Sequence, residues 1–528
     1  MQQPDIIFIV LDTQRADRLG CYGRQVRDTG ASISPNLDAF ALRGTLFERA
    51  VAPAQWTIPS HASMFTGLYP SAHQVLQSNQ TLGPDRPHLA EALQAAGYET
   101  IGFCNNPLVG ILNNGFKRGF ERFYNYGGAI PSMPESATRL PWPLNRALES
   151  YTQFLRRISY PIQNFFGQSD VAFRLSLNAW LTPIWSKLAN FKGQNQRSVH
   201  DLTHLLRRRE GEKTKQPLFL FLNLMETHLP FWPPGEYIDL VAPYFRNNQE
   251  ARDILRRWNR EAYRWAAPLA EPLGELEERV LGDIYDAEVA YQDDYLGKLF
   301  DFFAQRDKAN NTLTIIVSDH GDGLGEHGYF GHAFVAYEEL VHVPLILHWP
   351  DKMPAGRRIA GPVSTRRVYQ TMLDAAGTLP KGMNHLDSLE IHGLSLMETI
   401  HGRDPENNTA FSEIYPPLNF AKAIQRRQPE LLQRFRCLEN RLAVVRDTFK
   451  LIRVSDWPEE LFDLDADPLE LANLLSEHPA VAANLNLEGE QLAQLTQKQR
   501  ENLAAGTSLD LEADEQLLER LRGLGYVE

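Results

Sequence analysis

The sequence predicts an α/β fold with a doubly wound, mostly parallel sheet, followed by a smaller C-terminal α+β subdomain. Continuous apolar runs rich in β-branched residues recur along the chain, as expected of parallel strands buried on both faces. Segments with helical periodicity separate them. After about residue 405 the pattern changes to short strands and a polar helical end. We therefore expect a main α/β domain over 1–404 and a subdomain over 405–528.

The main domain is predicted from strands that alternate with helices. Ser34 and Pro35 are typical of a helix start, and Gly44 of its end. A second helix is expected over 87–96 and ends before Gly97. A long third helix is expected from the apolar stripe between Ile284 and Phe302. The predicted strands are 5–11, 98–103, 218–223, 313–317 and 343–347.

Residues 131–215 do not follow this alternation. They are rich in aromatic residues, prolines and arginines, and we expect a helical insertion over one edge of the sheet. The insertion would either pack against the sheet or act as a lid. It could also offer a face to an apolar substrate or a membrane.

The C-terminal subdomain is predicted to contain a small antiparallel sheet. Segments 441–445 and 449–454 are strand-like, with Asp447 in the turn between them, and 461–464 would add a third strand. The remainder, to about residue 524, is predicted to be helical.

Charge and cysteine content exclude several classes of protein. A net charge of −13 argues against a nucleic-acid partner, although one cation could still attract a small anionic substrate. Three scattered cysteines are too few for a disulfide framework or thiolate metal cluster. No apolar run approaches the ~20 residues of a transmembrane helix. The chain enters a strand about five residues in, so we expect no signal peptide and a cytoplasmic location.

Three predicted strands end in residues that bind divalent cations. The first ends at Asp12, the second leads through Glu226 to His228, and another ends at Asp319 and His320. Ligands of open α/β sheets bind beyond the carboxyl ends of strands. Carboxylates and an imidazole gathered there suit a divalent cation of intermediate hardness.

Thr57 lies just ahead of another predicted helix, which Pro59 begins. On its own, a threonine there is more typical of a helix cap than of a catalytic group. A helix N-terminus is also an anion site, so Thr57 could instead face a substrate.

These segments together resemble the motifs of the sulfatase family, within the alkaline phosphatase superfamily. The match keeps the family's order and spans most of the chain apart from 131–215. Segment 10–23 resembles the opening motif and 56–67, ending before Leu68-Tyr-Pro70, the nucleophile motif. The other matching segments are 223–228, 318–332 and 460–468.

The resemblance implies a role for each matching residue. Asp12, Asp319 and His320 would bind one divalent metal ion, with Thr57 as a further ligand and the nucleophile. His228 and His332 would act catalytically at the substrate's oxygens or leaving group. His61 and Asn105 would bind substrate. For His332 the alternative is a surface-loop histidine.

For other polar residues of these motifs, supporting roles are an alternative to direct ones. Glu226, Asp322, Glu326 and His327 suit an outer layer or a solvated loop at least as well as direct roles. Arg15 and Asp17 are expected to form a structural pair.

The chain departs from the family at its most reactive position. Sulfatases carry a cysteine or serine that becomes formylglycine, in a Cys-x-Pro-Ser-Arg motif. Here the sequence is Thr57-Ile-Pro-Ser-His61, so no formylglycine is expected. The second aspartate of the opening motif is Thr13, and a family lysine and histidine are replaced by Asn105 and Pro107.

This departure favours phosphorus over sulfur. A threonine cannot expel sulfate by re-forming an aldehyde, whereas a phosphothreonine can be hydrolysed beside a metal. We therefore predict a metal-dependent hydrolase of small anionic esters: phosphate monoesters or diesters, or phosphonates, before sulfates.

Ca²⁺ fits the sulfatase resemblance, and Mn²⁺ or Zn²⁺ fits relatives with a threonine nucleophile. The alternatives are an arylsulfatase-like sulfuric ester hydrolase, a transferase to an alcohol acceptor, and a non-catalytic anion- or metal-binding protein. The oligomeric state stays open.

Overall fold

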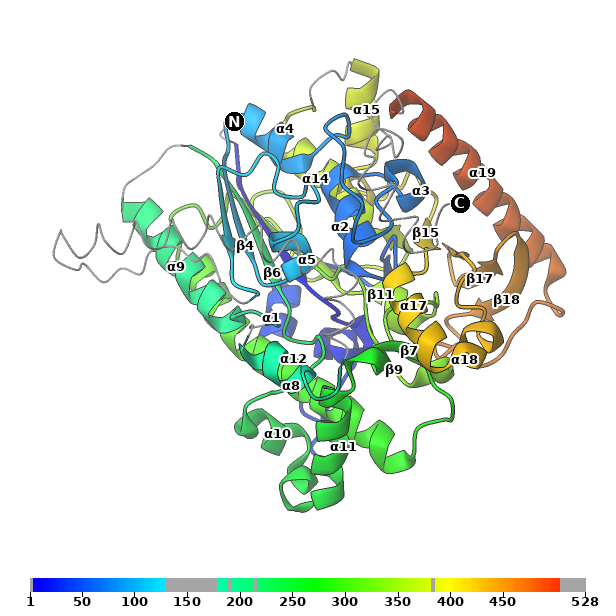
Figure 1. Cartoon of the computed structure of the whole chain (residues 1–528). Coiled ribbons are helices and arrows are strands. Elements are labelled where there is room, and N and C mark those ends of the chain that lie inside the picture. The colour runs from blue at the N-terminus through cyan, green and yellow to red at the C-terminus, as the bar shows by residue number, and fades with distance from the viewer. Residues whose placement is uncertain (1–2, 129–177, 189–190, 212–215, 381–384, 504–528) are drawn as a thin grey trace, which may run out of the picture.

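A large sheet forms the centre of the molecule. The computed structural model describes residues 3–128, 178–188, 191–211, 216–380 and 385–503 (Figure 1). The sheet has eight strands in the order β13-β2-β12-β8-β1-β6-β4-β5. Their bounds are β1 Asp5–Leu11, β2 Thr45–Phe47, β4 Glu99–Cys104, β5 Arg122–Asn125, β6 Leu218–Leu224, β8 Thr312–Val317, β12 Leu345–His348 and β13 Arg357–Ile359.

The sheet is mostly parallel, as predicted. β1 runs parallel to both neighbours, β6 and β8, and β4 runs parallel to β5 and β6. β12 is antiparallel to β8 and to β2. The prediction of one strand over 343–347 was wrong, because Pro344 lacks the N–H needed for a continuous ladder. The chain instead forms β11 (His342–Val343), which pairs with β3 (Ala50–Val51), and then β12.

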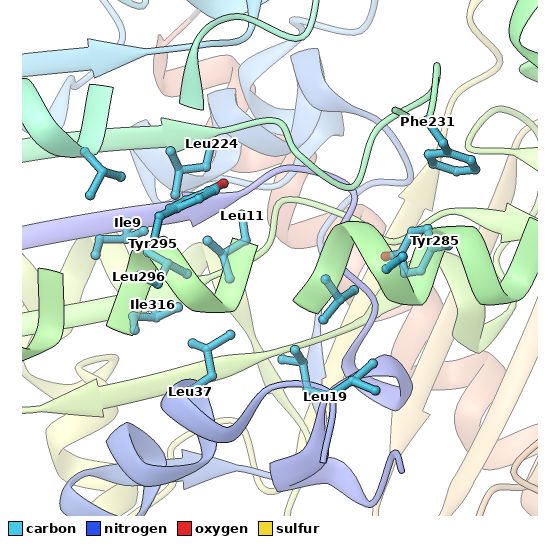
Figure 2. Packing of buried hydrophobic residues seen from close by; sticks show 14 of the residues in the cluster. Ile9, Leu11, Leu19, Leu37, Leu224, Phe231, Tyr285, Tyr295, Leu296 and Ile316 are labelled. Atoms are coloured by element: carbon cyan, nitrogen blue, oxygen red, sulfur yellow. The ribbon is translucent and has the colours of Figure 1, made fainter. Parts of the chain in front are cut away.

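Helices cover both faces of the sheet. Along β1, Ile7, Ile9 and Leu11 join one buried cluster, and Ile6, Phe8 and Val10 join another on the opposite face. Figure 2 shows the first cluster, in which Ile9 and Leu11 lie beside Tyr295 and Leu296 of α12. This two-sided burial explains the continuous apolar runs and confirms the doubly wound fold.

The predicted helices are present with small shifts at their ends. They are α1 (Pro35–Arg43), α4 (Leu89–Ala95) and α12 (Glu275–Ala304). The others used below or visible in Figure 1 are α2 Thr57–Thr66, α3 Pro70–His73, α5 Pro107–Gly110, α8 Thr182–Leu188, α9 Asn195–Gly211, α10 Gly235–Val241, α11 Gln249–Arg260, α13 Glu338–Val341, α14 Val368–Ala376, α15 His385–Gly393, α16 Leu396–Ile400, α17 Leu418–Arg427, α18 Pro429–Arg434 and α19 Pro479–Leu503.

The C-terminal part contains a four-stranded antiparallel sheet. β16 (Arg441–Arg446) and β17 (Phe449–Val454) pair as predicted, and Asp447 takes φ +52° in their turn. The predicted third strand lies within β18 (Trp457–Asp463). An unpredicted strand, β15 (Thr409–Ile414), pairs with β16, and α19 packs against the sheet. The apolar pattern of β15 is interrupted by polar residues, so sequence analysis did not predict this strand.

Two short three-stranded sheets complete the strand list. One joins β7 (Ala266–Pro268), β10 (Tyr329–Gly331) and β9 (Gly323–Leu324). The other joins β11, β3 and β14 (Val363–Ser364).

The predicted insertion is described only in part. Residues 131–177, 189–190 and 212–215 lie outside the described residues, so the question of a lid lies there too. The described part forms α8 and α9, and α9 packs against α12. The expected helical tail beyond Leu503 is likewise outside. Within the described residues, no helix has the length and apolar character needed to cross a membrane.

Candidate active site

The ends of β1 and β8 bring three predicted metal ligands together. The two strands pair Val10 with Val317, so Asp12 and Asp319 follow at the same level of the sheet. Asp12, Asp319 and His320 are fully buried, and their ligand atoms lie within 4.8 Å of one another. The parallel pairing of the strands thus creates the cluster.

The cluster has the free ligand atoms that a cation needs. Asp12 Oδ1 and Asp319 Oδ2 are buried and have no hydrogen bond of good geometry among the described residues, although His61 Nδ1 lies 3.3 Å from Asp319 Oδ2. His320 Nδ1 donates to Gly321 O at 2.7 Å, which leaves the Nε2 lone pair available. Two carboxylate oxygens and an imidazole nitrogen fit Ca²⁺, Mn²⁺ or Zn²⁺.

Electrostatics also favour a cation at this cluster. Burial raises the pKa of Asp12 to about 7, and the neighbouring Asp319 charge adds to the effect. Burial also disfavours ionisation of Asp319, but His320 and His61 outweigh it and hold that pKa at about 2. A divalent cation would let both carboxylates ionise together.

Two asparagines that sequence analysis missed orient Asp12. Asn106 Nδ2 donates to Asp12 Oδ2 at 2.6 Å, and Asn223 Nδ2 approaches the same oxygen at 3.4 Å. Asn106 follows β4 and Asn223 lies within β6. Their positions at the carboxyl ends of neighbouring strands were the available indication.

Thr57 lies against the cluster as the first residue of α2. The prediction that it stands ahead of this helix was wrong by one residue: Trp56 is the N-cap and makes no side-chain capping bond. Thr57 Oγ1 lies 3.3 Å from His320 Nε2, and Thr57 is 2% exposed. The helix start therefore presents the Thr57 hydroxyl to His320, one of the predicted metal ligands, rather than to its own backbone.

His61, one turn along α2, lies beside the cluster and is fully buried. Its Nδ1 lies 3.0 Å from Thr57 O and 3.3 Å from Asp319 Oδ2. Burial opposes its protonation, but the Asp319 carboxylate outweighs burial and raises the pKa of His61. These contacts favour a role in holding Asp319; its predicted contact with substrate stays a prediction.

Asn105 is fully occupied by protein contacts. Its Nδ2 donates to Asn223 O and to Ser198 Oγ, both at 2.9 Å, and its Oδ1 accepts from Gln194 N at 2.9 Å. The geometry favours an anchor for the segment before α9. Its predicted substrate contact remains untested.

His228 and His332 lie on the more open side of the cluster. Their rings are 5.1 Å apart, and the His332 ring is 4.5 Å from that of His320. His332 Nδ1 lies 2.8 Å from Asp322 Oδ1, and its side chain is 12% exposed. This carboxylate partner and the burial are not those of a surface-loop histidine.

The two histidines have opposite protonation tendencies. His228 Nδ1 donates to Leu229 O at 2.6 Å, and burial together with nearby His332 lowers the pKa of His228. Burial disfavours the charged form of His332 as well, but Asp322 outweighs it and raises the pKa. One ring thus favours the neutral form and the other the imidazolium.

Arg15 joins the loops that carry these groups. It donates to both carboxylate oxygens of Asp17 at 2.9 Å, as the predicted structural pair requires. Its Nη1 also donates to Asp322 O at 3.2 Å and to Glu326 Oε1 at 2.8 Å. The side chain of Glu326 is thus paired with Arg15, that of Asp322 with His332, and His327 contacts Glu339.

Comparisons with known proteins indicate the family of this chain. A family model described as Sulfatase matches residues 4–378, and one described as N-sulphoglucosamine sulphohydrolase, C-terminal, matches 325–498. An arylsulfatase of Clostridium perfringens is 25% identical over 492 residues, covering 90% of each chain.

Two further similar proteins are named for the alkaline phosphatase superfamily and for phosphonate ester hydrolysis. The multifunctional alkaline phosphatase superfamily protein PehA of Trinickia caryophylli is 25% identical over 518 residues, covering 92% of this chain and 93% of its own. The phosphonate monoester hydrolase structure from Agrobacterium radiobacter has a TM-score of 0.63 at 21% identity, covering 94% and 96% of the chains. The second likeness shows the fold. With its family model spanning most of the chain, this protein belongs to the sulfatase family and is an ester hydrolase.

Proposed function

We propose that this chain hydrolyses phosphate or phosphonate esters, with Thr57 as the nucleophile. The observation that carries the proposal is the Thr57 hydroxyl, 3.3 Å from His320 Nε2 in a cluster with free carboxylate oxygens. Asp12, Asp319, His320 and Thr57 would hold one divalent cation. The similarity to PehA of the alkaline phosphatase superfamily and to a phosphonate monoester hydrolase supports phosphorus.

A divalent cation held by these residues would lower the pKa of the Thr57 hydroxyl and supply Lewis-acid charge for the ester. Thr57, having lost its proton to solvent, attacks phosphorus in line while the ester P–O bond breaks. His332, protonated beside Asp322, donates its Nε2 proton to the departing oxygen, which leaves as an alcohol. Neutral His228 can accept a hydrogen bond at Nε2 and so orient a substrate hydroxyl or water.

The second half of the reaction restores the enzyme. Water attacks the phosphothreonine and gives a proton to the now neutral His332. The P–Oγ bond breaks, phosphate or phosphonate leaves, and Thr57 is free again. Sulfur is less suited to this route, because a threonine sulfate has no aldehyde-forming path of release.

The test is a rate panel of aryl phosphate monoester, phosphodiester, phosphonate monoester and aryl sulfate, each with Ca²⁺, Mn²⁺ and Zn²⁺. Phosphorus esters should be faster, and Thr57→Val should lower kcat/KM by about 10⁴-fold or more. Thr57→Ser keeps the hydroxyl and should retain far more activity. A dominant sulfatase rate, or a Thr57→Val variant within tenfold of wild type, would overturn the proposal.

The alternatives predict different products from the same panel. Glycerol or ethanolamine added as acceptor would yield a new ester if the enzyme were a transferase. Inactivity on every ester with every metal would favour a binding protein. Hydrolysis products alone support the proposal.

A further inference from the structure

The turn that follows β1 connects the two carboxylates of the candidate metal cluster. Gln14 donates its backbone N–H to Leu11 O at 3.2 Å and closes this turn directly after the strand. Asp12 and Thr13 are the two central residues of the turn, and both are fully buried. Thr13 donates its backbone N–H to Asp319 Oδ1 at 3.3 Å. The turn therefore supplies one candidate ligand, Asp12, and contacts another, Asp319.

The backbone of Thr13 has an uncommon conformation. Its φ is +60°, in the left-handed region that glycine and asparagine adopt far more readily than other residues. A β-branched residue is disfavoured there, so the surrounding structure must hold the turn in this shape. Backbone strain of this kind is concentrated at functional sites. The groups that hold Thr13 are therefore candidates for a role at the cluster.

Tyr285 of α12 anchors the turn on both sides of its last residue. The Tyr285 hydroxyl donates to Thr13 O at 2.7 Å and accepts from Arg15 N at 3.0 Å. Tyr285 is fully buried, and Figure 2 shows it on α12. Two helical turns further along, Gln292 Nε2 donates to Gln14 Oε1 at 3.1 Å. Two side chains on one face of α12 thus fix the shape of the turn.

These contacts determine which oxygen of Asp319 is free for a cation. Oδ1 accepts from two backbone N–H groups, those of Thr13 and His320, at 3.3 and 3.0 Å. Oδ2 has no hydrogen bond of good geometry among the described residues and lies 3.4 Å from His320 Nε2. A carboxylate that is held at one oxygen presents the other in a fixed direction. Without the Thr13 N–H, the Asp319 carboxylate would be freer to rotate.

We infer that Tyr285 is a positioning residue for the metal cluster, and that it acts on Asp319 through the strained backbone of Thr13. The Tyr285 hydroxyl holds the φ of Thr13, and this φ directs the Thr13 N–H toward Asp319 Oδ1. The inference rests on the proposed function for the identity of Asp319 as a metal ligand. It adds two residues, neither of which binds the cation through its side chain, to the groups that prepare this site.

Calorimetric metal binding tests the inference without turnover. Mn²⁺, Ca²⁺ and Zn²⁺ are titrated into the full-length protein after treatment with a chelator. Tyr285→Phe removes only the hydroxyl and should weaken the binding of the tightest of these metals by about 10-fold or more. Tyr295→Phe is the matched control, because Tyr295 is also buried on α12 and its hydroxyl donates to Glu226 at 3.2 Å. This control should leave the metal affinity unchanged.

Two variants of Thr13 test the route through the backbone. Both glycine and alanine lack the hydroxyl, but only glycine adopts a φ of +60° freely. Thr13→Gly should therefore bind metal about fivefold more tightly than Thr13→Ala. In the Tyr285→Phe background, Thr13→Gly should restore most of the lost affinity, because glycine does not need the tyrosine to hold it in this conformation. The comparison of Thr13→Gly with Thr13→Ala stays decisive if Tyr285→Phe does not fold.

The outcomes distinguish the two proposals. Wild-type affinity in Tyr285→Phe, equal affinities in Thr13→Ala and Thr13→Gly, or no rescue by Thr13→Gly would overturn this inference. A tyrosine that only supports the fold would lower the free energy of unfolding and leave the metal affinity unchanged. Affinities in the expected order support the inference even if the ester panel shows no turnover, and then the proposed reaction alone fails. A wild-type protein that binds none of the three metals would overturn both.

Discussion

Among the buried carboxylates of the described residues, two groups differ in how their charge is balanced. In the C-terminal part, Lys450 is fully buried, and its Nζ lies 2.8 Å from both Glu338 Oε1 and Glu470 Oε1. At the strand ends, Asp12 and Asp319 have no lysine or arginine partner in the described part of the chain. One group carries its own cation, and the other has free oxygens for an external one.

The difference shows what each group is built for. A buried carboxylate needs a partner charge, because removing it from water is costly. Lys450 supplies that charge permanently and joins α13 to β17 and to the segment after β18. The Asp12–Asp319 pair has no such lysine among the described residues, and it lies where Thr57, His228 and His332 also meet.

The largest effect is expected from a substitution in the Asp12–Asp319 pair, the group that has free oxygens for an external cation. Asp12→Asn removes a ligand charge but preserves the acceptor for Asn106, so the fold should persist. We expect loss of bound metal and a kcat/KM lower by about 10⁴-fold, which is about 5.5 kcal/mol. Metal content by mass spectrometry and rates on the best ester would measure this.

The matched control for Asp12→Asn is Asp301→Asn, an exposed position on α12. It should change neither metal content nor rate. Stoichiometric metal in Asp12→Asn, or activity within tenfold, would remove Asp12 from the ligand set.

Removal of the Lys450 charge, which balances Glu338 and Glu470, should instead reduce stability. Lys450→Met leaves Glu338 and Glu470 without their cation, at an expected cost of about 3–5 kcal/mol. Denaturant unfolding would measure it, and kcat per folded molecule should stay within about threefold. Lys298→Met is the control, because Lys298 is 66% exposed and its pair with Asp294 contributes little. Equal unfolding curves for Lys450→Met and wild type would contradict this assignment.

A finer change tests how the metal ligands are held. Asn106→Ala removes the 2.6 Å hydrogen bond to Asp12 and should weaken metal affinity by about 10–100-fold. Asn105→Ala is the neighbouring comparison, since Asn105 contacts Ser198, Gln194 and the backbone oxygen of Asn223 but not Asp12 itself. Metal titration should separate the two variants; similar affinities would mean that Asn106 does not orient the ligand.

Sequence analysis could predict the sheet and the grouping of the proposed metal ligands for the same reason. Buried parallel strands are apolar throughout, so a polar residue directly after one, such as Asp12 or Asp319, stands out and is placed by the sheet. The role of Asn106 was not predicted, because it depends on a neighbouring strand end, which a single segment does not reveal. Lys450 and Lys192 escaped because each looks like an ordinary surface lysine until the fold brings two glutamates to it.

The smallest expected effect is on stability and concerns a histidine beside the group of Lys450, Glu338 and Glu470. His327 Nδ1 lies 3.0 Å from Glu339 Oε1, and its ring stacks on Tyr337 with centroids 3.8 Å apart. Burial opposes protonation, but the Glu339 contact outweighs it and raises the pKa of His327 to about 9. Because the folded pKa is raised, the stabilisation that His327 supplies is complete below about pH 6.5 and is lost as pH rises through 9.

His327→Asn, whose side chain tolerates the local φ of +54°, should therefore destabilise the protein by about 1–2 kcal/mol at pH 6. The difference should shrink toward zero by about pH 10, where wild-type His327 is neutral too. Thermal unfolding of both proteins across this pH range measures it, and a difference that grows with pH would show that His327 is neutral in the folded protein.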